Sequence, residues 1–164
     1  SIDTHKRFIK NLRQACTWAE EAQVILSIET MDDPYINSIK KYLAIEKEIN
    51  SPFLYVYPDI GNISAWNNNL LDEFYKGRQS IASIHLKDTY AVTEDSNGQF
   101  RDVPFGEGCV EWEKFFKILK DIHYNGPFLI EMWSENYDTV EETRYAIKTA
   151  QSFLYPLIEK VGLK

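Results

Sequence analysis

Four short apolar segments of this sequence each end in a residue that can bind a metal ion. The end residues are Glu29, Asp59, His85 and Glu131. Charged side chains in strands are costly to bury unless they are paired or bound to a metal. Three carboxylates and one imidazole form a ligand set that suits a divalent cation such as zinc or manganese. The four residues are predicted to form one metal site, with a structural salt-bridge network as the alternative.

The elements that would position these residues alternate along the chain. Apolar spacing predicts strands over residues 24–29, 53–59, 81–85 and 128–131, and helices over residues 4–21, 37–49, 66–76 and 111–123. Gly77 is expected to cap the third helix, and Asp138 to cap a last helix that reaches Leu157. Residues 89–109 are predicted to be a long polar loop, a feature that is often functional.

Strands that alternate with helices in this way pack as parallel βα units of about 30 residues each. In a β/α barrel the C-terminal ends of the strands share one face, which carries the active site. The fold class is therefore α/β, of the (β/α)8 TIM-barrel type. The 164 residues supply about four βα units of a barrel that typically needs ~250 residues. Residues 1–164 are interpreted as one domain and a half barrel, and three arrangements stay open: a fragment, associated half barrels, and an open sheet.

The composition limits the classes of partner that the chain is expected to bind. The formal net charge of −7 argues against wholesale binding to a nucleic-acid backbone, which favours a basic face. A small phosphorylated substrate stays compatible with this charge, because a local pocket can be positive. No apolar run approaches the roughly 20 residues of a membrane span, and no signal peptide is visible. Cys16 and Cys109 are read as reduced thiols, so the expected location is the cytoplasm.

Five motifs occur in an order that matches a known family over about residues 11–153. Together they closely resemble the C-terminal half of the L-ribulose-5-phosphate 3-epimerases, also called L-xylulose-5-phosphate 3-epimerases, which are xylose-isomerase-like TIM barrels. The motifs are Glu29-Thr30-Met31-Asp32, Tyr57-Pro58-Asp59-Ile60-Gly61-Asn62, Ile84-His85-Leu86-Lys87-Asp88-Thr89, Pro104-Phe105-Gly106-Glu107-Gly108 and Leu129-Ile130-Glu131-Met132-Trp133.

This resemblance implies that Glu29, Asp59, His85 and Glu131 hold one divalent metal ion, with Glu29 and Glu131 also acting as the acid/base pair. The implied reaction is 3-epimerisation of a pentulose 5-phosphate through an enediolate. Physical chemistry supports that assignment, because inversion at C3 needs a base on each side of the carbon and a Lewis acid beside the developing negative charge. The implied partner is a small phosphorylated sugar.

Other residues are weaker candidates for contact with the substrate. The resemblance places Arg101 near a substrate-contacting basic residue of many relatives. Lys87 follows His85 by two positions and could contact substrate or balance the acidic cluster. Trp66 and Trp133 could wall the pocket or pack in the core. Ser134 and Asn136 follow the last strand, where barrels often bind phosphate.

Several alternatives to the epimerase stay open. An aldose–ketose isomerase of the hexulose-6-phosphate isomerase type would use the same metal ligands. A lone half barrel could be an inactive fragment, or it could act as a homo-oligomer or by pairing with the missing N-terminal half. A multi-zinc phosphodiesterase is disfavoured, because the chain has only three His residues and a net negative charge.

Overall fold

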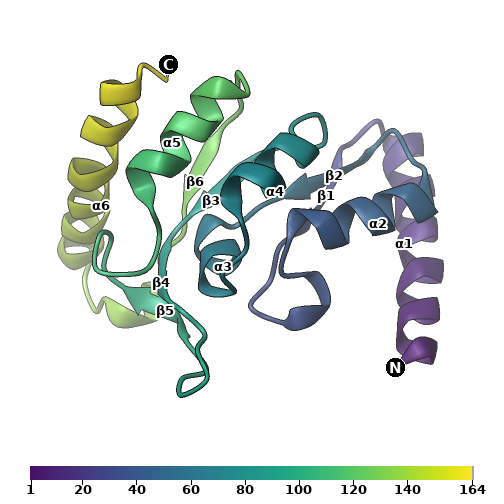
Figure 1. The fold of residues 1–164 in the computed structure, drawn as a ribbon, viewed down its shortest axis with the longest axis horizontal. Helices are drawn as coiled ribbons and strands as arrows, with labels where there is room; N and C mark the ends of the chain where they lie inside the picture. Colours follow the sequence, from purple (N-terminus) through teal and green to yellow (C-terminus); the bar gives the residue numbers. More distant parts are fainter. Residues whose placement is uncertain (164) are drawn as a thin grey trace.

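The computed structural model describes residues 1–163, apart from the side chain of Ser134. Helices and strands alternate along most of the described chain, and the two termini lie at opposite ends of the molecule (Figure 1). The elements are α1 (Ile2–Ala22), β1 (Leu26–Glu29), η1 (Pro34–Ile36), α2 (Ile39–Ile49), β2 (Leu54–Tyr57), α3 (Ile60–Ala65), α4 (Leu70–Gly77), β3 (Ile84–Leu86), β4 (Asp88–Tyr90), β5 (Gln99–Val103), α5 (Trp112–Asp121), β6 (Phe128–Ile130), η2 (Ser134–Asn136) and α6 (Val140–Val161).

A parallel sheet forms the inner layer. β1 pairs with β2 in parallel, and β3 pairs with β6 in parallel. Two isolated parallel bridges, Val56 with Ile81 and Asp59 with His85, join β2 to β3. Within residues 1–163 the strand order is therefore β1-β2-β3-β6, with β1 and β6 as its two open edges. This α/β arrangement supplies about half of the eight strands of a TIM barrel.

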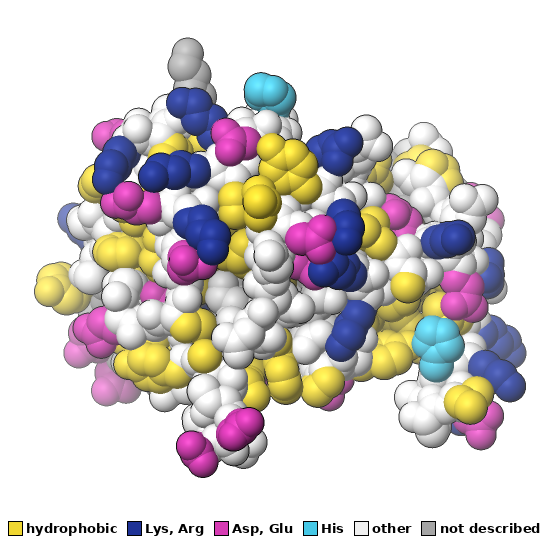
Figure 2. All heavy atoms as spheres, viewed as in Figure 1, with side chains coloured by type: hydrophobic (Ala, Val, Ile, Leu, Met, Phe, Trp, Pro, Cys, Tyr) yellow, Lys and Arg dark blue, Asp and Glu magenta, His cyan; other side chains and the backbone are white. Residues whose placement is uncertain are grey.

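The helices form the outer layer. α1, α2, α4, α5 and α6 follow one another side by side along one face of the strands (Figure 1). Acidic and basic side chains are interspersed on this helical face (Figure 2). They include exposed ion pairs such as Lys76 with Asp72 and Lys114 with Glu111. None of the described helices has the length and apolar character needed to cross a membrane.

The core lies between the helices and the strands. It is built from the apolar stripe of each helix and from strand residues that point outward toward the helices, as amphipathic spacing requires. Its largest fully buried apolar side chains are Tyr42, Phe74, Phe115, Phe116, Ile39, Ile60, Ile63, Ile84, Leu86, Leu119 and Leu154. This packing holds the strands at fixed positions, so that their C-terminal ends are held in place as well.

Local signals explain where most helices begin. Ser38 caps α2 by accepting a hydrogen bond from the backbone N–H of Lys41. At the start of α6, Thr139 and Glu142 form a capping box, in which each side chain accepts a hydrogen bond from the other residue's backbone. The prediction that Asp138 caps this helix is wrong by one residue. The helix also continues past Leu157 to Val161, with Pro156 in its last turns.

Other predicted boundaries also need correction. The helix expected over residues 66–76 begins only at Leu70, as α4, and a separate helix that was not predicted, α3, precedes it. Between them the chain turns at Asn67, which has a positive φ of 54°. Asn69 then caps α4 through the N–H of Asp72, and Gly77 is the last helical residue rather than the cap. The strands are also shorter than expected: β1 begins only at Leu26 and β3 only at Ile84.

The predicted loop over residues 89–109 is wrong in part, since it contains most of an antiparallel hairpin. β4 pairs with β5 through Asp88 with Val103 and Tyr90 with Gln99. The turn between them uses Gly98, which has a φ of +73° and can adopt this conformation because it lacks a Cβ. The hairpin extends away from the parallel strands (Figure 1).

Candidate metal centre at the strand ends

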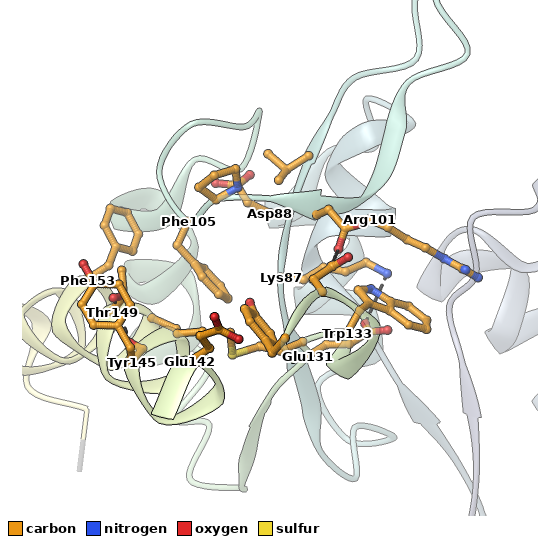
Figure 3. Close-up of a pocket in the computed structure, with 18 of the residues that line it drawn as sticks. Lys87, Asp88, Arg101, Phe105, Glu131, Trp133, Glu142, Tyr145, Thr149 and Phe153 are labelled. Atoms are coloured by element: carbon orange, nitrogen blue, oxygen red, sulfur yellow. Dashed lines mark hydrogen bonds and ion pairs between the residues drawn. The ribbon is translucent and has the colours of Figure 1, made fainter. Parts of the chain in front are cut away.

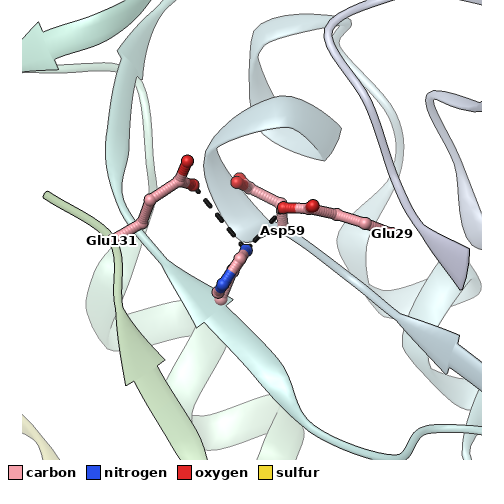
Figure 4. A group of neighbouring side chains, drawn as sticks. Glu29, Asp59 and Glu131 are labelled. Carbon is pink, nitrogen blue, oxygen red and sulfur yellow. Dashed lines mark hydrogen bonds and ion pairs between the residues drawn. The ribbon is translucent and has the colours of Figure 1, made fainter. Parts of the chain in front are cut away.

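The four predicted ligands meet at the C-terminal ends of the parallel strands. Glu29 ends β1, Asp59 follows β2, His85 lies in β3 and Glu131 follows β6. One nitrogen or oxygen from each of them lies within 4.8 Å of those of the other three. The Nδ1 atom of His85 is 2.5 Å from Oε1 of Glu29 and 3.7 Å from Oε2 of Glu131. Figure 4 shows the three carboxylates converging from separate strands.

Backbone contacts between neighbouring strands fix this geometry. The N–H of His85 donates to the carbonyl of Pro58, and the N–H of Glu131 donates to the carbonyl of Leu86. Each contact joins a ligand to the strand beside it. The ligands are therefore placed by the sheet itself, as expected when rigid elements carry a functional site.

Asp59 is the most firmly held ligand. It is fully buried, and its Oδ1 accepts a hydrogen bond from the N–H of Asn62, so that Asp59 caps α3. The N–H of Asp59 donates to Oγ1 of Thr30, next to Glu29 in the chain. Asn62 donates from its side chain to the carbonyl of Thr30. These contacts leave Oδ2 of Asp59 directed at the cluster.

The unsatisfied oxygens of the cluster fit a metal ion. Oδ2 of Asp59 and Oε2 of Glu131 are buried, and neither accepts a hydrogen bond from the described residues. Buried polar atoms normally have a partner, and the only cation close to both oxygens in the described part of the chain is Lys87. A divalent cation would satisfy these lone pairs, and the donor set of three carboxylates and one imidazole suits manganese or zinc.

The electrostatics of the cluster also favour a cation. Burial raises the pKa of Asp59 to about 7, although the Lys87 ammonium and the Asn62 N–H oppose this change. Burial also acts to raise the pKa of Glu131, but the neighbouring Asp59 and Lys87 outweigh it and hold this pKa below its usual value. Burial acts to lower the pKa of His85, and Glu29 together with the other carboxylates reverses the effect and raises it. Without a metal, the cluster therefore retains protons that a metal would displace.

A cavity of about 890 Å³ opens beside the cluster. Glu131 and Lys87 reach it from the strand ends, and Arg101 and Trp133 lie at the side formed by β5 and the segment after β6 (Figure 3). The guanidinium carbon of Arg101 lies 4.2 Å from the centre of the Trp133 ring. The opposite wall comes from α6, through Tyr145, Thr149 and Phe153 (Figure 3).

Of the other residues predicted to contact the substrate, Asn136 lines this cavity and Trp66 does not. The side-chain amide of Asn136 donates to the carboxylate of Asp102 in β5. Trp66 packs on Phe100 instead, with 6.0 Å between the ring centres. The side chain of Ser134 lies outside what the structure describes.

Two residues near the centre were not singled out from the sequence. The ring of Tyr57 lies 4.2 Å from the His85 ring and limits its rotation. Asp88 is buried, and its carboxylate accepts hydrogen bonds from the N–H groups of Thr89, Gly106 and Val110 and from the Trp112 indole. Tyr57 precedes Asp59 by two positions and Asp88 follows His85 by three, and this proximity to candidate ligands is the only signal in the sequence for the two residues.

Fold and site together define an α/β-barrel chain with a cluster of carboxylates and one imidazole at its strand ends that could hold a metal ion. The family model of the xylose isomerase-like TIM barrels matches residues 2–157. The chain belongs to that family.

Comparison with curated proteins gives more specific relatives within this family. The chain is 50% identical over 161 residues to SgbU of Haemophilus influenzae, which is provisionally named an L-ribulose-5-phosphate 3-epimerase; the match covers 98% of this chain and 55% of that protein. It is 40% identical over 161 residues to the L-ribulose-5-phosphate 3-epimerase UlaE of Escherichia coli, covering 98% of this chain and 54% of UlaE. The chain therefore spans about half the length of the curated relatives it matches.

A solved structure supports the fold. The xylose isomerase domain protein of Planctomyces limnophilus superposes with a TM-score of 0.78 at 22% identity, covering 95% of this chain and 54% of that chain. The expectation of a TIM-barrel type fold is confirmed by the family match and by this likeness.

Proposed function

We propose that this chain carries the metal centre and the acid–base pair of a pentulose-phosphate 3-epimerase. The observation that carries the proposal is the convergence of Glu29, Asp59, His85 and Glu131, with ligand atoms within 4.8 Å of one another. The names of the relatives at 40% and 50% identity supply the substrate class, a ketopentose phosphate.

The positions of the two glutamates suit inversion at a carbon atom. Glu29 ends β1 and Glu131 follows β6, and these are the two outermost strands of the parallel sheet in the described chain. The two carboxylates thus approach the centre from different sides, with Asp59 between them in Figure 4. One glutamate takes the proton from C3, and the other returns a proton to the opposite face.

The remaining residues would bind the metal ion or orient the side chains that bind it. His85 and Asp59 complete the ligand set for one divalent cation, either zinc or manganese. When bound, this cation polarises the ketose carbonyl and stabilises the negative charge that develops as the C3 proton leaves. Asp59 is held by Thr30 and Asn62, so its free oxygen stays aimed at the centre. Tyr57 restricts the His85 ring.

The cavity next to the centre is the proposed substrate site. Arg101, Trp133 and Asn136 line it and would contact the sugar phosphate, with Arg101 as the cation suited to phosphate oxygens. The open edges β1 and β6 would be closed by further βα units, from an N-terminal half or a second copy. We place this metabolic role in the cytoplasm.

Hydrogen exchange in deuterated water tests the proposal. The chain is incubated with L-xylulose 5-phosphate and added Mn²⁺ or Zn²⁺, and NMR locates any deuterium bound to carbon. Deuterium at C3 that is lost in both Glu29→Gln and Glu131→Gln supports the epimerase. Deuterium at C1 instead assigns the isomerase reaction. Metal binding without any exchange means that this chain alone is catalytically incomplete.

A further inference from the structure

Lys87 is a buried cation in the acidic cluster. The residue is 8% exposed and lies between β3 and β4. Its side-chain stem runs against Gly61 in α3, where an added Cβ would come within 2.8 Å of Cγ of Lys87. The absence of a side chain at Gly61 therefore gives the lysine its path toward the strand ends.

The ammonium of Lys87 lies near the two buried oxygens of Asp59 and Glu131 that accept no hydrogen bond from the described residues. Its Nζ is 3.1 Å from Oδ2 of Asp59 and 3.2 Å from Oε2 of Glu131. Figure 3 shows Lys87 and Glu131 directed toward each other at the edge of the cavity. A metal ion held by the cluster would be bound by the same two carboxylates.

We propose that Lys87 is a positioning residue with two opposed effects on the metal centre. Its positive charge holds Asp59 and Glu131 together while no metal is bound, and the same charge weakens the binding of a divalent cation. This inference rests on the metal centre proposed above, and it names the residue that sets the affinity of that centre.

Elementary electrostatics gives the direction of both effects. Removal of one partner from a buried ion pair leaves the other charge uncompensated, which strongly destabilises a fold. Here two carboxylates would lose their shared cation, so the metal-free chain would be less stable. A unit positive charge a few ångströms from a divalent cation repels it, so loss of that charge would tighten metal binding.

Thermal unfolding of the metal-free chain tests the first effect. Lys87→Met removes the charge and keeps most of the side-chain volume. We expect its Tm to fall by about 5–10 °C. Asp59→Asn removes one carboxylate and keeps a good helix cap at the start of α3. The double variant Lys87→Met/Asp59→Asn should then be more stable than Lys87→Met, and a double variant that is no more stable would overturn the counter-charge role.

Calorimetric titration with Mn²⁺ at pH 8 tests the second effect. Lys87→Met should bind at least about tenfold more tightly than the wild type. Lys114→Met is the matched control, because it removes an exposed lysine that pairs with Glu111 at 2.6 Å, and its affinity should equal that of the wild type. Where Lys87→Met folds only with Mn²⁺, release of the ion into excess chelator replaces the titration and should slow about tenfold.

The two proposals fail in different ways. A wild-type chain that binds neither Mn²⁺ nor Zn²⁺ overturns the metal centre, and the role of Lys87 with it. A wild-type chain that binds Mn²⁺ while Lys87→Met binds it equally or more weakly overturns the role of Lys87 alone.

Discussion

The indole N–H of Trp112 donates to Oδ2 of Asp88 across 3.0 Å, which ties the first residue of α5 to the first residue of β4. The same carboxylate accepts backbone N–H groups of Gly106 and Val110. One buried acid thereby fixes the segment between the hairpin and α5, which forms part of the cavity wall.

Asp88→Ala should therefore destabilise the chain by about 3–5 kcal/mol, because several buried donors lose their acceptor at once. Urea unfolding measures the change. Asp95→Ala is the control, since Asp95 is exposed in the hairpin turn, and it should change stability by less than about 0.5 kcal/mol. Equal effects for the two variants would contradict the anchoring role of Asp88.

Gly108 should tolerate no side chain. An added Cβ would lie 2.1 Å from Oδ1 of Asp88 and 2.4 Å from the carbonyl oxygen of Thr89. Gly108→Ala is expected to cost about 3 kcal/mol of stability. Gly162→Ala, at the end of α6, meets only Lys120 Nζ at 3.5 Å and should cost about 1 kcal/mol for its positive φ. Thermal unfolding of both variants checks the order.

Metal binding should strengthen as pH rises through neutrality. The pKa of Asp59 is raised from 3.8 to about 7 by burial, so the folded metal-free chain holds this proton over an interval in which the unfolded chain has lost it. The stability of the metal-free chain therefore falls as pH rises from about 4 to 7. A metal ion must displace the proton below pH 7.

Calorimetry in buffers of different ionisation enthalpy measures that displacement. We expect Mn²⁺ binding to release more protons at pH 6 than at pH 8. Proton release that does not differ between the two pH values would show that Asp59 is already ionised in the metal-free chain.

Arg101→Met should raise the KM for a pentulose 5-phosphate by about tenfold or more and change kcat less, because a phosphate contact contributes to binding in the ground state and the transition state alike. Steady-state kinetics on the complete enzyme measures the split. Arg78→Met, an exposed arginine after α4, is the control. A large drop in kcat with unchanged KM would place Arg101 in the chemical step instead.

The convergence of Glu29, Asp59, His85 and Glu131 could be predicted from the sequence, because each closes a short apolar run and parallel strands bring such ends together. The family match supports that reading of the fold. The hairpin over β4 and β5 could not be predicted in the same way, because its strands are polar and short and their pairing depends on contacts across the turn at Gly98.

The anchoring role of Asp88 could not be predicted from the sequence either. Apart from the adjacent Thr89, the residues whose N–H groups donate to Asp88 are 18 to 24 positions away, and no motif links them to Asp88 in the sequence. The late start of α4 has a different reason: residues 66–69 carry one large aromatic and three asparagines, and the left-handed backbone at Asn67 together with the Asn69 cap delays the helix to Leu70. The identity of the sugar contacts stays a prediction.

All four candidate ligands come from one unbroken stretch of chain, Glu29 to Glu131, in successive βα units. The proposed metal centre is thus heritable as a single module. Recombination that exchanged the remainder of a barrel would leave this cluster intact and alter the βα units around it. A lineage built this way could vary the rest of its pocket without rebuilding the cluster.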